Sequence, residues 1–114
     1  MIFATGGSAF TPKIPGLENF SHWAHAKSLN DFDRINTSQA FKNADHITIV
    51  GAGLIGLETA ENVRKMGKNV TVVELAEQIL TPWDAKFSTL GRKVLEENGI
   101  EVKLNTQINQ IAAD

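Results

Sequence analysis

The sequence predicts an α/β domain built around a mostly parallel sheet, because strand-like and helix-like segments alternate along its second half. Three segments have the β-branched or alternating pattern of strands, namely residues 46–50, 69–74 and 100–104. Between them lie two segments with apolar residues at helical spacing, 54–66 and 81–97. The short connections imply right-handed crossovers between parallel strands, so we expect a three-layer arrangement of helices and sheet.

Local signals predict the start of the second helix and two weaker elements. Thr81, Pro82 and Asp84 suit the cap, the first helical position and the first turn of a helix, in that order. Apolar positions within residues 30–41 favour one further helix. Residues 107–112 are expected to begin a fourth strand.

A glycine-rich segment joins the first predicted strand to the first predicted helix. It reads Gly51-Ala52-Gly53-Leu54-Ile55-Gly56 and fits the pattern G-x-G-x-x-G, which is weak evidence when it stands alone. Here it follows a strand and opens a helix, and Glu74 ends the next strand at about the 20-residue offset of a dinucleotide-binding site. With Ala60 and Gly67 as further small residues, the pattern predicts a Rossmann-type domain.

Each position of this fingerprint has a physical role. Gly51 allows the tight turn, Gly53 lets a pyrophosphate approach the backbone, and Gly56 lets the helix lie close to the sheet. The phosphates would meet free N–H groups at the positive end of the helix dipole. The carboxylate of Glu74 can accept hydrogen bonds from both hydroxyls of the adenosine ribose and would repel a 2′-phosphate. No arginine follows within residues 75–78 to offset that repulsion. The motif therefore favours NAD(H) over NADP(H), although FAD presents the same ADP half.

The composition excludes several other classes of function. The formal net charge is −2, which does not favour binding to a nucleic-acid backbone, and the chain has no cysteine for a disulfide, a thiolate metal site or thiol redox chemistry. No apolar run is long enough for a membrane span and no secretory signal is present, so we expect a cytoplasmic location. His22 and His25 lie in a predicted loop without a rigid third ligand, so no metal site is expected.

Several segments together resemble the FAD-dependent pyridine nucleotide–disulfide oxidoreductases, most closely the branch of NADH oxidases, NADH peroxidases and coenzyme A-disulfide reductases. Thr5 and Gly6 belong to an Ala-Thr-Gly segment that resembles the end of the first half of that family's FAD domain. Residues 12–16 resemble the connector that follows, residues 51–58 the NAD fingerprint, and residues 79–84 the loop before the second helix of the NAD domain.

The resemblance implies a division of the chain and a role for further residues. Residues 1–20 would be the remnant of the FAD-domain end and its connector, and residues 21–114 the NAD(H)-binding domain. The fingerprint would occupy the NAD slot, because it follows the Ala-Thr-Gly segment, and Thr5 and Gly6 would lie on the flavin side. Glu58 would lie near the contact of nicotinamide and flavin and help position the reacting rings. The alternative is an exposed helical glutamate paired with Lys65 or Asn62.

The resemblance also implies the activity of a parent enzyme, which would transfer hydride from NADH to FAD and on to a disulfide, a peroxide or oxygen. We therefore expect a truncated chain whose missing partners are the FAD and dimerisation domains, with Met1 as an added start. Without a flavin site, the chain alone is not expected to oxidise NADH. The alternative is a stand-alone NAD-binding or regulatory module without catalysis, and bound flavin in a longer gene product would distinguish the two.

Overall fold

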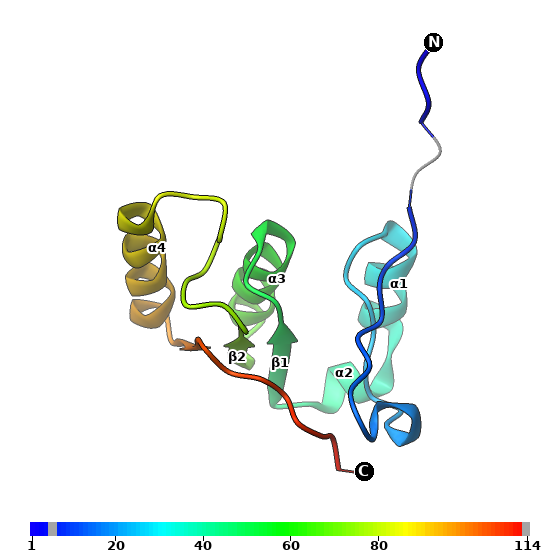
Figure 1. The fold of residues 1–114 in the computed structure, drawn as a ribbon. Coiled ribbons are helices and arrows are strands. Elements are labelled where there is room, and N and C mark those ends of the chain that lie inside the picture. The colour runs from blue at the N-terminus through cyan, green and yellow to red at the C-terminus, as the bar shows by residue number, and fades with distance from the viewer. Residues whose placement is uncertain (5–6, 113–114) are drawn as a thin grey trace.

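The computed structural model describes residues 1–4 and 7–112 and has an α/β fold with one parallel sheet (Figure 1). Strands β1 (His46–Val50), β2 (Asn69–Val73) and β3 (Ile100–Lys103) lie side by side in that order. Helix α3 (Leu54–Lys65) connects β1 to β2, and helix α4 (Ala85–Glu97) connects β2 to β3. The predicted α/β class with a parallel sheet is confirmed.

One face of the sheet forms the hydrophobic core. Side chains alternate along each strand, and one alternate set of strand residues packs with α3 in a single cluster. The buried members of this cluster are Ala52, Ala60, Val63, Val70, Val72, Ile79, Ile100 and Val102. Leu95 of α4 packs against the same cluster, so α3 and α4 cover the same face, as right-handed crossovers in one direction require. The described residues thus supply the sheet and one helical layer of the predicted arrangement.

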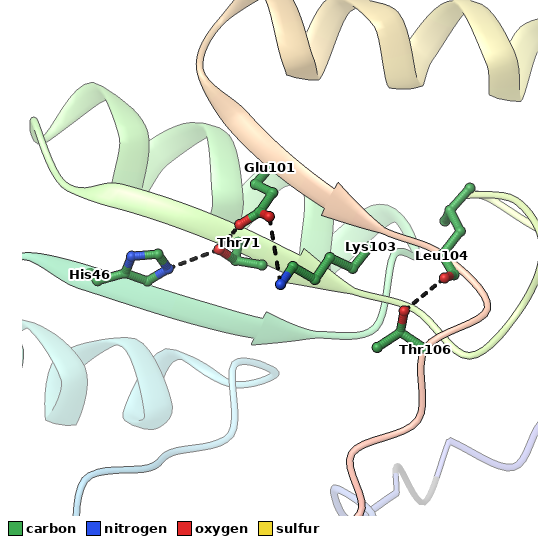
Figure 2. Close-up of polar contacts among 6 residues, drawn as sticks. All are labelled: His46, Thr71, Glu101, Lys103, Leu104 and Thr106. Carbon is green, nitrogen blue, oxygen red and sulfur yellow. Dashed lines mark hydrogen bonds and ion pairs between the residues drawn. The ribbon is translucent and has the colours of Figure 1, made fainter.

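The opposite face of the sheet carries a chain of polar contacts (Figure 2). His46 Nε2 lies 2.8 Å from Thr71 Oγ1, and the Thr71 hydroxyl donates to Glu101 Oε2 at 2.9 Å. Lys103 Nζ lies 3.6 Å from Glu101 Oε1. These contacts link all three strands and satisfy the hydroxyl of Thr71, which is only 6% exposed.

The single helix predicted over residues 30–41 is wrong, because two short helices occupy this region. They are α1 (Leu29–Thr37) and α2 (Gln39–Asn43), preceded by the 3-10 turn η1 (Leu17–Asn19). Ser38 separates the two helices with an extended backbone, and its side chain accepts a hydrogen bond from Phe41 N–H at 3.3 Å. A serine hydroxyl that caps a new helix competes with continuation of the old one. None of the helices in the described ranges has the length and apolar character needed to cross a membrane.

The start of α1 is fixed by reciprocal hydrogen bonds. Asp31 N–H donates to the Ser28 hydroxyl at 3.2 Å, and Ser28 N–H donates to Asp31 Oδ2 at 2.8 Å. This arrangement is a capping box, which satisfies two N–H groups that a helix terminus leaves without partners. The Ser28 N–H that donates to the Asp31 carboxylate, with a smaller contribution from the Ser28 side chain, holds the pKa of that carboxyl below its usual value.

The start predicted for the second connecting helix is also wrong, because α4 begins at Ala85 rather than near Thr81. Asp84 is the N-cap residue, and its carboxylate accepts a hydrogen bond from Lys86 N–H at 2.9 Å. Trp83 N–H donates to Leu80 C=O at 2.8 Å, so Thr81 and Pro82 lie in a separate turn. That turn follows Leu80, which has a left-handed backbone with φ of 49°.

The fourth strand predicted over residues 107–112 is not formed, because the backbone there bonds to loops instead of to a strand. Asn105 has φ of 49°, which turns the chain away from the direction of β3, and its N–H donates to Ala76 C=O at 2.9 Å. Further along, Ile111 N–H donates to Pro15 C=O at 2.8 Å. The C-terminal segment therefore runs back to the connector near the N-terminus (Figure 1).

The corrected start of α4 leads to a stability prediction. Asp84→Ala should lower the free energy of unfolding by about 1 kcal/mol, since Lys86 N–H loses its acceptor at the helix terminus. Thr81→Ala, the matched control at the position first predicted as the cap, should change it by less than about 0.5 kcal/mol. Urea unfolding followed by circular dichroism measures both values. A larger loss of unfolding free energy for Thr81→Ala than for Asp84→Ala would contradict Asp84 as the N-cap residue and favour a helix start near Thr81.

Candidate dinucleotide-binding site

The glycine-rich segment forms a tight turn at the carboxyl end of β1. Gly51 has φ of 104°, a conformation that side chains disfavour, and its N–H donates to Val73 C=O at 2.8 Å. Gly53 is the N-cap residue of α3 and provides no side chain to cap the helix. The chain thus changes from strand to helix within three residues, as Gly51, Ala52 and Gly53 predict. The amino end of α3 lies at the carboxyl edge of the sheet.

The glycines of this turn have different surroundings, and the roles predicted for them from the sequence also differ. A Cβ atom added to Gly51 or Gly53 would meet no atom of the described residues within 4 Å, so the space before the loop is open. A Cβ atom added to Gly56 would overlap the carbonyl oxygen of Gly51. Gly56 therefore permits the close packing of α3 on the loop, whereas Gly53 leaves room for a group that approaches from solvent.

The amino end of α3 suits an anion. A helix leaves its first four N–H groups without intrahelical acceptors, and here these groups belong to the N-cap residue Gly53 and to Leu54, Ile55 and Gly56. Leu54 and Ile55 are 64% and 51% exposed, so this end of the helix is open to solvent. The residues therefore fit the pyrophosphate of a dinucleotide, which binds through N–H groups and the helix dipole without a cationic side chain.

Glu74 lies directly beside the glycine-rich turn, although 22 residues separate it from Ala52. Ala52 N–H donates to Glu74 Oε2 at 2.8 Å, and Ala76 N–H donates to Glu74 Oε1 at 2.9 Å. The spacing of the motif predicted an acid at the end of the neighbouring strand, and β2 places it there. That its carboxylate binds the loop itself had no signal in the sequence.

Leu80 is a second neighbour of the loop that sequence reasoning did not single out as a site residue. Leu80 N–H donates to Ala52 C=O at 2.9 Å, and the adjacent Ile79 is buried in the core with 1% exposure. Ala52 is also 1% exposed. The resemblance of residues 79–84 to a loop of the family's NAD domain was the one sequence signal that linked them to the site. It did not reveal the backbone contact between Leu80 and Ala52.

The remaining predicted site residues lie apart from these contacts. Glu58 is exposed on α3, and its side chain has no hydrogen bond or ion pair with any residue that the structure describes. Lys65, one partner considered for it, pairs instead with Glu61 at 2.7 Å. Thr5 and Gly6 lie outside the described residues.

The histidines make local contacts. His25 Nε2 lies 2.9 Å from Thr11 Oγ1, and its ring packs edge-on against Trp23 with ring centres 5.2 Å apart. Within residues 1–4 and 7–112, no cluster of three or more histidine, aspartate or glutamate side chains could hold a metal ion.

The fold and this turn define a class of protein, the Rossmann-type α/β domains with a glycine-rich loop at the end of the first strand. Comparison with known proteins then gives the family. The sequence profile described as pyridine nucleotide-disulphide oxidoreductase matches residues 1–114. The chain belongs to this family, and the resemblance predicted from its sequence is confirmed.

The relatives are longer proteins. A nitric oxide reductase FlRd-NAD(+) reductase of Pectobacterium atrosepticum is 35% identical over 113 residues, which cover 97% of this chain and 28% of the relative. An NADH oxidase of Streptococcus pneumoniae is 28% identical over 129 residues, covering all of this chain and 28% of the relative. The chain thus spans a little over a quarter of the length of these relatives.

Solved structures share the fold. Reduced CoADR-RHD of Bacillus anthracis superposes with a TM-score of 0.87 at 29% identity, covering 93% of this chain and 19% of that one. A water-forming NADH oxidase from Lactobacillus brevis, solved bound to NADH, superposes with a TM-score of 0.83 at 25% identity, covering 95% of this chain and 24% of that one.

The contact at Gly56 predicts a difference between two glycine substitutions. Gly56→Ala should lower the free energy of unfolding by at least about 1 kcal/mol, because overlap with the Gly51 carbonyl outweighs the better helix propensity of alanine. Gly53→Ala, the matched control, should change it by less than about 1 kcal/mol, since open space surrounds its Cβ position. Urea unfolding of both variants decides, and equal stabilities would contradict the close packing.

Proposed function

We propose that this chain binds NAD(H) and serves as the nicotinamide-nucleotide domain of an FAD-dependent oxidoreductase. One observation carries the proposal: the open approach to Gly51 and Gly53 lies at the amino end of α3, with the carboxylate of Glu74 beside it. An anionic group and a pair of hydroxyls, held a short distance apart, are what this arrangement can bind. Those are the pyrophosphate and the adenosine ribose of a dinucleotide.

The phosphate part of the proposal rests on backbone atoms. In our proposal the N–H groups at the start of α3 bind the pyrophosphate, and Gly53 provides the room for it. Family membership and the likeness to an NADH oxidase solved with NADH support this assignment. Ala52, Leu54 and Ile55 are the other residues of the fingerprint and would complete the binding loop.

Glu74 would determine the choice between NADH and NADPH. An ionised carboxylate has about four acceptor positions, and the N–H groups of Ala52 and Ala76 occupy only one on each oxygen. Both ribose hydroxyls can therefore donate to Glu74 while it keeps its contacts. A 2′-phosphate in the same place would bring a second anion against the carboxylate, with no arginine within residues 75–78 to offset it.

The remaining assignments concern the parent enzyme. NADH supplies a hydride when bound, and the flavin of the longer protein would accept it before a disulfide, a peroxide or oxygen takes the electrons. In the parent enzyme Glu58 would help to position the nicotinamide. Its side chain is exposed and makes no hydrogen bond or ion pair with another described residue, so it is available for this role. In this proposal residues 1–20, including Thr5 and Gly6, belong to the flavin side and residues 21–114 to the NAD(H) domain.

The test of this function is a calorimetric titration of the 114-residue chain with NADH and with NADPH. NADH should bind roughly tenfold more tightly or better, because the carboxylate repels the 2′-phosphate. Glu77→Gln removes one exposed charge three residues further along and should leave the preference unchanged. Equal affinities for the two nucleotides would refute the role of Glu74.

A substitution in the loop tests the phosphate site separately. Gly53→Val should abolish NADH binding while circular dichroism shows an unchanged fold, since the new side chain would fill the open space before the loop. Gly7→Val, a matched change at an exposed glycine outside the loop, should bind NADH as the unsubstituted chain does. Normal binding by Gly53→Val would place the phosphates elsewhere.

A further inference from the structure

The peptide groups of Ala52 are held on both sides by the segment that follows β2. The N–H of Ala52 donates to Glu74 Oε2 at 2.8 Å, and its carbonyl accepts from Leu80 N–H at 2.9 Å. Ala52 is 1% exposed, so water does not compete for these groups. The residues on either side of Ala52 are glycines, which have the greatest backbone freedom of any residue.

We propose that Glu74 and Leu80 act as positioning residues that hold the phosphate-binding loop in its binding conformation before any ligand arrives. We call the two hydrogen bonds that join Ala52 to Glu74 and Leu80 the clamp. The identity of the ligand rests on the function proposed above, whereas the clamp is a property of the free chain. Fixing a loop in advance improves affinity, because the ligand no longer has to order it. Glu74 would then act on the phosphates indirectly, by holding the backbone of Ala52, and on the ribose directly, through its remaining acceptor positions.

The clamp is itself firmly placed. The second oxygen of Glu74 accepts from Ala76 N–H at 2.9 Å, and Glu74 N–H donates to Lys103 C=O at 2.8 Å. The carbonyl of Glu74 accepts from Thr106 N–H at 3.0 Å. Glu74 therefore has fixed contacts through its side chain and both backbone groups, so its carboxylate can transmit that rigidity to Ala52.

Leu80 supplies the other half of the clamp through an unusual conformation. Its φ of 49° is one that side chains disfavour, and the burial of Ile79 next to it fixes the segment against the core. In this conformation the N–H of Leu80 meets the carbonyl of Ala52. The strained residue thus lies at the position where it contacts the loop.

This proposal predicts a consequence that a ribose-binding role alone does not. Removing the carboxylate of Glu74 should weaken binding even of a ligand without ribose hydroxyls, because the loop that binds the phosphates would lose its order. Two suitable probes are ADP and 2′,3′-dideoxyadenosine 5′-diphosphate, which differ only in the two hydroxyls. The variant is Glu74→Ala, and Glu77→Ala is the matched control at an exposed glutamate.

The first measurement is amide hydrogen exchange in the chain without ligand. In Glu74→Ala the N–H of Ala52 should exchange about tenfold faster, relative to the N–H of Val72 in β2, than in the unsubstituted chain. The ratio removes any general loss of stability, which would move both amides. An unchanged ratio would overturn the clamp, whatever the chain binds.

The second measurement titrates both probes by nuclear magnetic resonance. Glu74→Ala should lower the affinity for the dideoxy nucleotide about fivefold or more, and Glu77→Ala should not. Unchanged affinity for the dideoxy probe with weakened ADP would overturn the positioning role and leave Glu74 as a ribose ligand. Should the unsubstituted chain bind neither probe, the proposed function fails, while the exchange ratio still decides whether the clamp exists.

A third measurement needs no variant and so does not depend on the folding of Glu74→Ala. A scalar coupling through the hydrogen bond should connect the backbone nitrogen of Ala52 with the carboxyl carbon of Glu74 in the unsubstituted chain. Its presence supports the clamp. Its absence, together with rapid exchange of the Ala52 N–H, would overturn it.

Discussion

The close approach of α3 to the end of β1 is the constraint on which the rest of this structure depends. Gly56 lies against the carbonyl of Gly51, and no side chain fits between them. This contact fixes the start of α3 at the carboxyl edge of the sheet and directs Ala60 and Val63, both buried, toward β2. The core and the open end of the helix thus follow from the same packing contact.

The carboxyl edge of the sheet is organised by backbone hydrogen bonds between loops that are distant in sequence. The segments that follow β2 and β3 are joined by two such bonds. Asn105 N–H donates to Ala76 C=O at 2.9 Å, and Thr106 N–H donates to Glu74 C=O at 3.0 Å. Loops that bind ligands usually have few such restraints. Here both backbone groups of Glu74 are hydrogen-bonded, its N–H to Lys103 C=O and its C=O to Thr106 N–H. These bonds explain how its half-buried carboxylate can keep a single orientation.

The sequence predicts the elements that depend on periodic burial and misses the boundaries that depend on individual polar groups. The strand over residues 46–50 has the predicted bounds, because its β-branched run ends at a glycine that must turn. Ser38 and Asp84 set helix ends that apolar spacing does not determine. Residues 107–112 look like a strand, but no strand partner is present among the described residues, and Ile111 bonds to Pro15.

The candidate site shows the same limit at the level of single atoms. Spacing alone places an acid at the end of β2 beside the glycine-rich turn, since the carboxyl ends of adjacent parallel strands share one edge. It does not predict that the oxygens of Glu74 already accept N–H groups from Ala52 and Ala76, because those contacts depend on the path of the following loop. In our proposal, an acid in this position has two effects, one on the ribose and one on the glycine-rich loop. Under that proposal, replacing Glu74 by an apolar residue to admit a 2′-phosphate would also remove the acceptor of the Ala52 N–H. Glutamine would remove the charge and keep an amide oxygen that can accept this bond, so the choice of nucleotide and the order of the loop can be altered separately only by a residue that retains an acceptor.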